Sequence, residues 1–162
     1  MRSLPFVVYI LTGCGADAAP VDLTDAPVEE ETPLVVDDQS PPITHAELVP
    51  WLADGAYQTW ACEAEAHPAR PPGAHRINRI CSNTLLSMTA AGAYPVGAAS
   101  VKELVQDGAV TGYAVVRKVT TTAWYWYEAY GDNVLAEGRS ITVCTGCHAG
   151  APRDLIFTRV EP

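Results

Sequence analysis

The apolar positions of this chain recur with a helical period in its first half and with a strand period in its second. Between residues 44 and 66 the apolar side chains form a stripe at helical spacing: Leu48, Trp51, Leu52, Tyr57 and Trp60. Thr44 and Glu47 form a capping box ahead of this stripe, so we predict one helix or two short helices beginning near Thr44. A further helix is predicted over residues 82–91, where leucines recur at helical spacing behind capping residues.

From residue 98 onward, runs of β-branched and aromatic residues are separated by glycine-containing turns. These runs predict strands over residues 98–105, 110–120, 123–130 and 155–160. Because the turns at 106–108 and 131–133 are short, neighbouring strands should pair as antiparallel hairpins. We therefore predict an α+β fold, a mainly antiparallel β-sheet with a few N-terminal helices packed on it.

The N-terminus has the composition of an export signal. Arg2 precedes an apolar run over residues 4–11, which is too short to span a bilayer, and small residues lead to Cys14. Residues 11–14 resemble the lipobox of bacterial lipoproteins, which implies a signal peptide over residues 1–13 and lipidation of Cys14. A plain secretory signal with a chance cysteine is the alternative. Either interpretation takes the chain out of the cytoplasm, and the lipobox implies an anchor on the periplasmic side of the cell envelope, at the outer membrane.

Residues 14–43 are rich in acids and prolines, with eight Asp or Glu and no Lys or Arg. Such a segment cannot bury enough apolar surface to offset its ordering entropy, so we predict a disordered tether. The net charge of −9 belongs mostly to this tether. The remainder is nearly neutral and has no basic patch of the kind that binds nucleic acid. One folded domain is predicted over residues 44–162.

The pentapeptide Cys144–Thr145–Gly146–Cys147–His148 carries the clearest chemistry. Two thiols at this spacing can add across both vinyl groups of one porphyrin, and the adjoining imidazole can bind the iron. In an exported chain, this motif predicts one covalently attached haem c, with His148 as the iron ligand.

Three other interpretations of the two thiols remain open. A structural zinc site would need a further ligand, for which Cys62, Cys81, His67 or His75 are candidates. A thioredoxin-like redox pair would sit at a helix start after a parallel strand. A simple disulfide across so small a loop is the third. For Cys62 and Cys81, which flank a Pro/Gly-rich loop, we predict a disulfide, and two buried reduced cysteines are the alternative.

The segments around the haem motif resemble the cytochrome P-460 family in order and spacing. They are GAHRINRICSN at residues 73–83, YPVG at 94–97, VKEL at 101–104, AWYWYE at 123–128 and DLIFT at 154–158. The resemblance covers about residues 45–160, and its most specific parts are the Val-Lys-Glu segment and the haem motif followed by Phe-Thr.

This resemblance implies a small, mainly β haem c domain, often dimeric, with a five-coordinate iron that has one open face. In well-known members a lysine, which matches Lys102, is bonded to the porphyrin edge, and these members oxidise hydroxylamine or nitric oxide. The related beta-type cytochromes c-prime lack that bond and bind nitric oxide or other small gases. Hydroxylamine-oxidising members carry a distal carboxylate, and residues 108–127 contain no Asp or Glu, which argues against hydroxylamine chemistry.

Two functions follow from these observations. In the first, a haem with an open face binds or redox-converts a small nitrogen oxide, and whether the protein is an enzyme is left open. In the second, a six-coordinate haem carries electrons to or from a redox partner protein, with Met88, His67 or His75 as candidate sixth ligands. The side chains of residues 124–127, Trp-Tyr-Trp-Tyr, should alternate across the sheet, so that one pair can wall the haem while the other pair faces the second layer or a partner.

Overall fold

The computed structural model of this protein describes residues 40–162. The predicted signal peptide, Cys14 and most of the predicted tether lie outside these residues. Two hydrogen bonds hold Ser40 and Pro41, which belong to the end of the predicted tether. Ser40 Oγ donates to the Gly97 carbonyl over 3.3 Å, and an Arg117 Nη donates to the Pro41 carbonyl over 2.7 Å.

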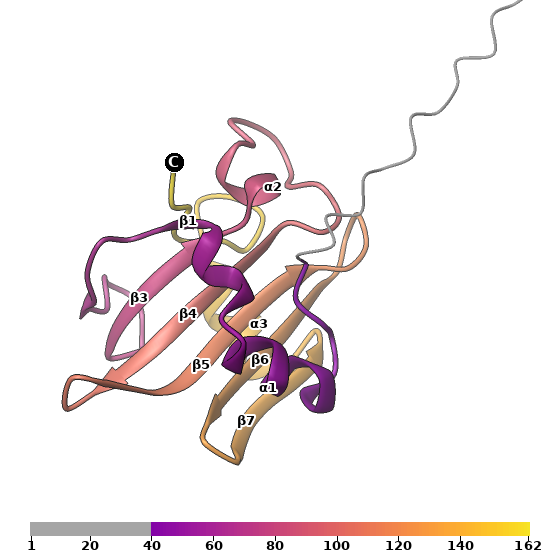
Figure 1. The fold of residues 1–162 in the computed structure, drawn as a ribbon. Helices are drawn as coiled ribbons and strands as arrows, with labels where there is room; N and C mark the ends of the chain where they lie inside the picture. The colour runs from indigo at the N-terminus through magenta and orange to yellow at the C-terminus, as the bar shows by residue number, and fades with distance from the viewer. Residues whose placement is uncertain (1–39) are drawn as a thin grey trace, which may run out of the picture. The chain divides into compact units, whose positions relative to one another are not determined.

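Within the described residues, seven strands form one antiparallel sheet (Figure 1). They are β1 (Ala61–Cys62), β2 (His67–Pro68), β3 (Ile77–Ser82), β4 (Ala99–Gln106), β5 (Ala109–Lys118), β6 (Trp124–Tyr130) and β7 (Asn133–Arg139). The order is β1-β3-β4-β5-β6-β7, and β2 also pairs with β3. The prediction of an α+β fold with a mainly antiparallel sheet is confirmed.

The strands differ from the prediction in two respects. Four strands, β1, β2, β3 and β7, were not predicted: β1 and β2 have only two residues each, and β3 and β7 carry polar residues at positions where an apolar alternation would identify a strand. Residues 155–160 were predicted as a strand, and this is wrong: they contribute only one isolated bridge, Arg153 to Ile156. The segment instead packs on the sheet, with Ile156 buried and the Leu155 carbonyl accepting a side-chain hydrogen bond.

The helical segments are short. They are α1 (His45–Ala53), the 3₁₀ helix η2 (Ala56–Thr59), α2 (Thr84–Ser87) and α3 (Thr142–His148). The predicted helix over residues 82–91 is reduced to the single turn α2, because Arg153 and Arg159 bind the carbonyls of Thr89 and Ala90 beyond it. None of the helices in the described part of the chain is long and apolar enough to cross a membrane.

The two faces of the sheet have separate cores. On one face α1 and η2 contribute Leu48, Leu52 and Tyr57 to a cluster that includes Tyr125 and Tyr127. On the other face a second cluster contains Trp124 and Trp126 with Leu86, Tyr94, Ala98 and Ile156, and Cys144 of α3 packs against it. The predicted alternation of Trp124–Tyr127 is therefore confirmed: the tyrosines belong to the cluster of the N-terminal helices, and the tryptophans belong to the cluster against which Cys144 of α3 packs.

Candidate functional site

The face of the sheet opposite α1 carries a cavity of about 320 Å³. Its floor comes from β3, β4, β5 and β6, and one wall comes from α3 with residues 156–158. The other wall is the loop that joins β2 to β3. The residues of this loop that line the cavity are Ala69, Arg70, Pro71, Gly73, Ala74 and His75. The cavity thus brings together segments that are about 80 residues apart in the chain.

The motif Cys144–His148 forms the last five residues of α3. Cys144 and Cys147 are both free thiols that line the cavity, and Cys144 is half-buried whereas Cys147 is exposed. Residues three apart lie on the same face of a helix, so both sulfurs can approach one planar ligand from the same side. Burial raises the pKa of the Cys144 thiol, which keeps it protonated at neutral pH.

His148 is held with one ring nitrogen available. Its Nδ1 lies 2.7 Å from the Leu155 carbonyl oxygen. Because a carbonyl can only accept, Nδ1 carries the hydrogen, and Nε2 keeps a lone pair that can bind a metal. The ring packs edge-on against Trp126 and Phe157, with centroid distances of 4.6 and 5.3 Å. Burial lowers the pKa of His148, which favours this neutral form.

The Leu155 carbonyl is placed by a buried ion pair. Lys118, whose side chain is 1% exposed, pairs with Asp154, whose carboxylate also accepts hydrogen bonds from the Tyr94 amide and the Trp124 indole. Burial would raise the pKa of Asp154, but these donors hold it below its usual value. Asp154 and Leu155 both have a positive φ, a conformation that non-glycine residues keep only where surrounding contacts enforce it.

A row of residues across four strands forms part of the floor. The strand register aligns Ile80 with Lys102, Lys102 with Ala114, and Ala114 with Glu128. The small Ala114 side chain leaves space between Lys102 and Glu128 above the sheet. Burial lowers the pKa of Lys102 to about 8, against the opposing effect of the Glu128 charge. An amine with this pKa can give up or take a proton near neutral pH.

Glu128 is a cavity residue that the sequence analysis did not single out. Residues 108–127 contain no acid, but the strand continues to Glu128 and its alternation returns that side chain to the cavity face. Its carboxylate lies 3.6 Å from His75 Nδ1. The His75 side chain, together with the Lys102 charge, holds the pKa of Glu128 below its usual value although burial opposes this. Because side chains alternate along a strand, extending the pattern by two residues from Trp126 would have placed Glu128 on the same face.

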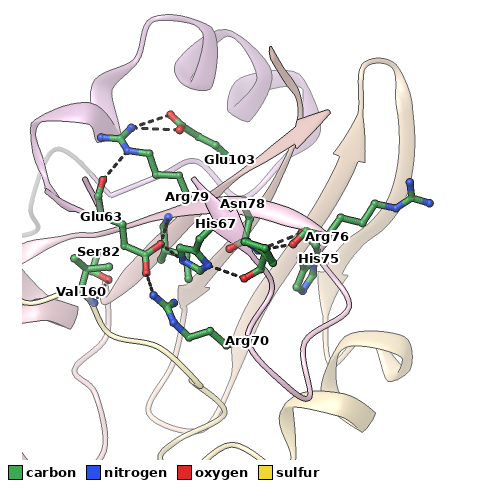
Figure 2. A network of polar contacts seen from close by, with 12 residues as sticks. Glu63, His67, Arg70, His75, Arg76, Asn78, Arg79, Ser82, Glu103 and Val160 are labelled. Atoms are coloured by element: carbon green, nitrogen blue, oxygen red, sulfur yellow. Dashed lines mark hydrogen bonds and ion pairs between the residues drawn. The ribbon is translucent and has the colours of Figure 1, made fainter. Parts of the chain in front are cut away.

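The wall formed by the β2–β3 loop is held by a polar network around Glu63, shown in Figure 2. The Glu63 carboxylate accepts hydrogen bonds from His67, Arg70 and the backbone amide of Ile80. Beside it, the Arg79 Nε donates to the Glu63 carbonyl, and an Nη of the same guanidinium pairs with Glu103 at 3.2 Å. The network lies along the edge of β3 that β1 and β2 cover.

The candidate sixth ligands are placed very differently. Met88 is 64% exposed and does not line the cavity. His67 lines the cavity, but its Nε2 is bound to Glu63 and its Nδ1 lies 2.7 Å from the Pro68 carbonyl, so neither nitrogen is available to a metal. His75 lines the cavity with its ring centroid 6.5 Å from that of His148. Of the three, only His75 both lines the cavity and lies beside His148.

Cys62 and Cys81 are joined by a disulfide between paired residues of β1 and β3. As disulfide sulfurs, they cannot be thiolate ligands for zinc together with Cys144 and Cys147. Across residues 40–162, no group of three or more His, Cys, Asp or Glu side chains is arranged to hold a metal ion. The free thiol pair also follows the antiparallel strand β7, unlike a thioredoxin-like pair, which follows a parallel strand.

The donor set of the cavity fits a covalent haem. It offers two free thiols on one helix face and an imidazole with a free Nε2. Apolar side chains of Ile80, Val116, Ile156 and Phe157 line the space beside them. Within the described residues the buried indole N–H of Trp126, which also lines the cavity, has no acceptor. An apolar space with a few polar groups is typical of a cofactor site.

No family model matches this sequence, and no match was found among curated proteins or among solved structures. The likeness to the cytochrome P-460 family therefore depends on the segments quoted above.

Proposed function

We propose that this protein is an exported, lipid-anchored cytochrome of the P-460 kind, with one haem c whose open face binds or redox-converts a small nitrogen oxide. The observation that carries this proposal is the set of groups that line one cavity. They are the His148 imidazole, whose Nε2 is free, two free thiols, Lys102 and Glu128. Cys144 and Cys147 would attach the haem and His148 would bind its iron. The bound haem would supply a redox-active iron with one coordination position for the small ligand.

The ionisable residues of the floor favour ligand chemistry over electron transfer alone. Lys102 is kept in the cavity although burial opposes its charge, and Glu128 lies on the same row. Groups held at such a cost are typical of sites that exchange protons with a ligand. Lys102 Nζ and the Glu128 carboxylate are the atoms that would hold or move these protons. Since Glu128 supplies a carboxylate, both nitric oxide and hydroxylamine are candidate ligands.

The test is expression of the chain together with a haem c maturation system. A denaturing gel stained for haem should show covalently bound haem. Absorption and resonance Raman spectra should then show a high-spin, five-coordinate iron that changes on addition of nitric oxide. Failure to attach haem would overturn the whole proposal, and a low-spin, six-coordinate iron without added ligand would overturn the open face.

A six-coordinate electron carrier is the second candidate, and one observation favours it. The His75 and His148 rings line the same cavity with centroids 6.5 Å apart, so both imidazoles could bind one haem iron. His75→Ala separates the two functions. It should leave the resting spectrum unchanged if the iron is five-coordinate, and convert low-spin to high-spin iron if His75 is the sixth ligand.

Lys102 is proposed to contact the haem, and the family resemblance implies a covalent bond to the porphyrin. Such a bond would join the Lys102 peptide to the haem peptide in mass spectrometry and shift the Soret band beyond that of ordinary haem c. An unchanged spectrum in Lys102→Ala would exclude the bond. A redox partner and a homodimer also belong to the proposal. Analytical ultracentrifugation of the haem-loaded protein tests the dimer.

A further inference from the structure

Glu63 binds three donors from separate places in the chain. Its carboxylate accepts from His67 Nε2 at 2.9 Å, from Arg70 Nη2 at 2.6 Å and from the Ile80 amide at 2.9 Å. The side chain is 13% exposed, so water competes little for these bonds. Burial would raise the pKa of Glu63, but the three donors lower it below its usual value and keep the carboxylate ionised near neutral pH.

The backbone of Glu63 is fixed to the sheet on both sides of the side chain. The disulfide of the preceding Cys62 joins it to β3, and Arg79 of β3 donates to the Glu63 carbonyl over 2.7 Å. The Glu63 amide also donates to the Ile80 carbonyl. Glu63 is therefore a fixed point on the sheet edge, from which its carboxylate reaches toward the loop (Figure 2).

Two of the three donors, His67 and Arg70, line the cavity wall themselves. The far end of the loop is held separately, because the buried Asn78 amide donates to the carbonyls of His75 and Arg76. Between these ends, the Ala69 amide donates to the Arg76 carbonyl and the Gly73 amide to the Arg70 carbonyl. Both of these bonds lie within the loop itself, so neither ties the loop to the sheet.

We propose that Glu63 is a positioning residue: its carboxylate holds the β2 end of the loop, at His67 and Arg70, against the sheet and thereby sets how fast a small ligand reaches the cavity. The part that concerns the wall needs no cofactor. The part that concerns ligand entry rests on the proposed function. Hydrogen bonds between charged groups are stronger than those between neutral groups. Removing the charged bonds of Glu63 should therefore loosen this wall more than any other part of the cavity.

Hydrogen exchange of the full chain, with or without haem, tests the wall. In Glu63→Gln the amides of Ala69 and Gly73 should exchange about tenfold faster, while β4 and β5 amides are unchanged. Glu65→Gln is the matched control, since Glu65 lies in the same segment, carries the same charge and is exposed. Glu63→Ala should give a larger effect, and its β4 and β5 amides report whether the sheet is intact. Equal exchange in Glu63→Gln and Glu65→Gln overturns the proposal.

Carbon monoxide binding to the reduced, haem-loaded protein tests entry. After flash photolysis, carbon monoxide should rebind severalfold faster in Glu63→Gln than in Glu65→Gln. Faster amide exchange with an unchanged rebinding rate would overturn the control of entry. If no haem is attached, the proposed function fails, whereas hydrogen exchange still decides the role of Glu63 in the wall.

Discussion

The two walls of the cavity are held by different physical means. The wall of α3 and residues 154–158 depends on the ion pair of Lys118 and Asp154, in which the lysine is 1% exposed. The wall of the β2–β3 loop depends on Glu63 and on Arg70, whose side chain is 53% exposed. A buried pair is costly to break, because one charge is then left without water or partner, whereas a partly exposed pair can be replaced by solvent. We infer that the wall of α3 and residues 154–158 is rigid, whereas the wall of the β2–β3 loop can move.

The largest expected effect concerns the thiols of the α3 wall. The double variant Cys144→Ala/Cys147→Ala should lose all covalent haem, because no thiol remains to bond the vinyl groups. Haem staining on a denaturing gel measures this. The matched variant Cys62→Ala/Cys81→Ala removes the disulfide beside the other wall and should keep haem in its folded fraction. Equal haem loss in both variants, per folded molecule, would contradict the assignment.

Breaking the buried pair should have the next largest effect. Asp154→Ala leaves Lys118 buried without a counter-charge, so the free energy of unfolding should fall by about 3–5 kcal/mol. Urea denaturation measures the loss. Glu161→Ala is the control, because it removes the carboxylate of an ion pair with Arg159 whose acid is 67% exposed, and it should cost less than about 1 kcal/mol. Similar losses in both variants would remove the contrast between buried and exposed pairs.

Replacing Lys102 by an apolar residue should stabilise the protein, by an amount that depends on pH. Its pKa falls from 10.5 to about 8 on folding, so the charged form opposes folding below pH 8. Between these two values the unfolded chain holds a proton that the folded chain has lost, and wild-type stability should rise with pH. In the haem-free protein, Lys102→Met should add up to about 3 kcal/mol at pH 7 and progressively less above pH 8. Urea denaturation at pH 7 and pH 10 tests this. A variant that is less stable at pH 7 would contradict it.

The smallest expected effect belongs to the β2–β3 wall. Glu63→Gln should lower the free energy of unfolding by only about 1–2 kcal/mol, since partly exposed Arg70 regains water. Because the folded-state pKa of Glu63 is lowered, its contribution is fully present above its ordinary pKa of 4.5 and is lost as pH falls from there through the lowered folded-state pKa. Urea denaturation at pH 7 and pH 4 measures both. Glu65→Gln should stay within about 0.5 kcal/mol at either pH. If Glu63→Gln lowered the free energy of unfolding as much as Asp154→Ala does, the two walls would be held equally strongly, which would contradict the comparison.

Much of the fold could be predicted from local patterns. The hairpins of β4 to β6 follow from turn residues between β-branched runs, and the helical stripe of α1 follows from its spacing. β3 and β7 could not be found in this way. Both strands are stabilised by pairing with a neighbouring strand, β3 with β4 and β7 with β6. The register of this pairing cannot be deduced from the residues of β3 and β7 themselves. Residues 155–160 have the composition of a strand, but side chains rather than another strand bind their backbone.

At the candidate site, the groups that are close together in the chain could be identified before folding was considered: two thiols and an imidazole within five residues, a lysine in a strand and a cysteine pair beside a loop. Their surroundings depend on contacts between distant segments. Glu128 reaches the cavity through strand register, and Asp154 meets Lys118 across 36 residues. His67 is bound at both nitrogens whereas His75 lies beside His148. The physical reason is that a residue type fixes which bonds it can make, while burial and long-range pairing fix which partners are within reach.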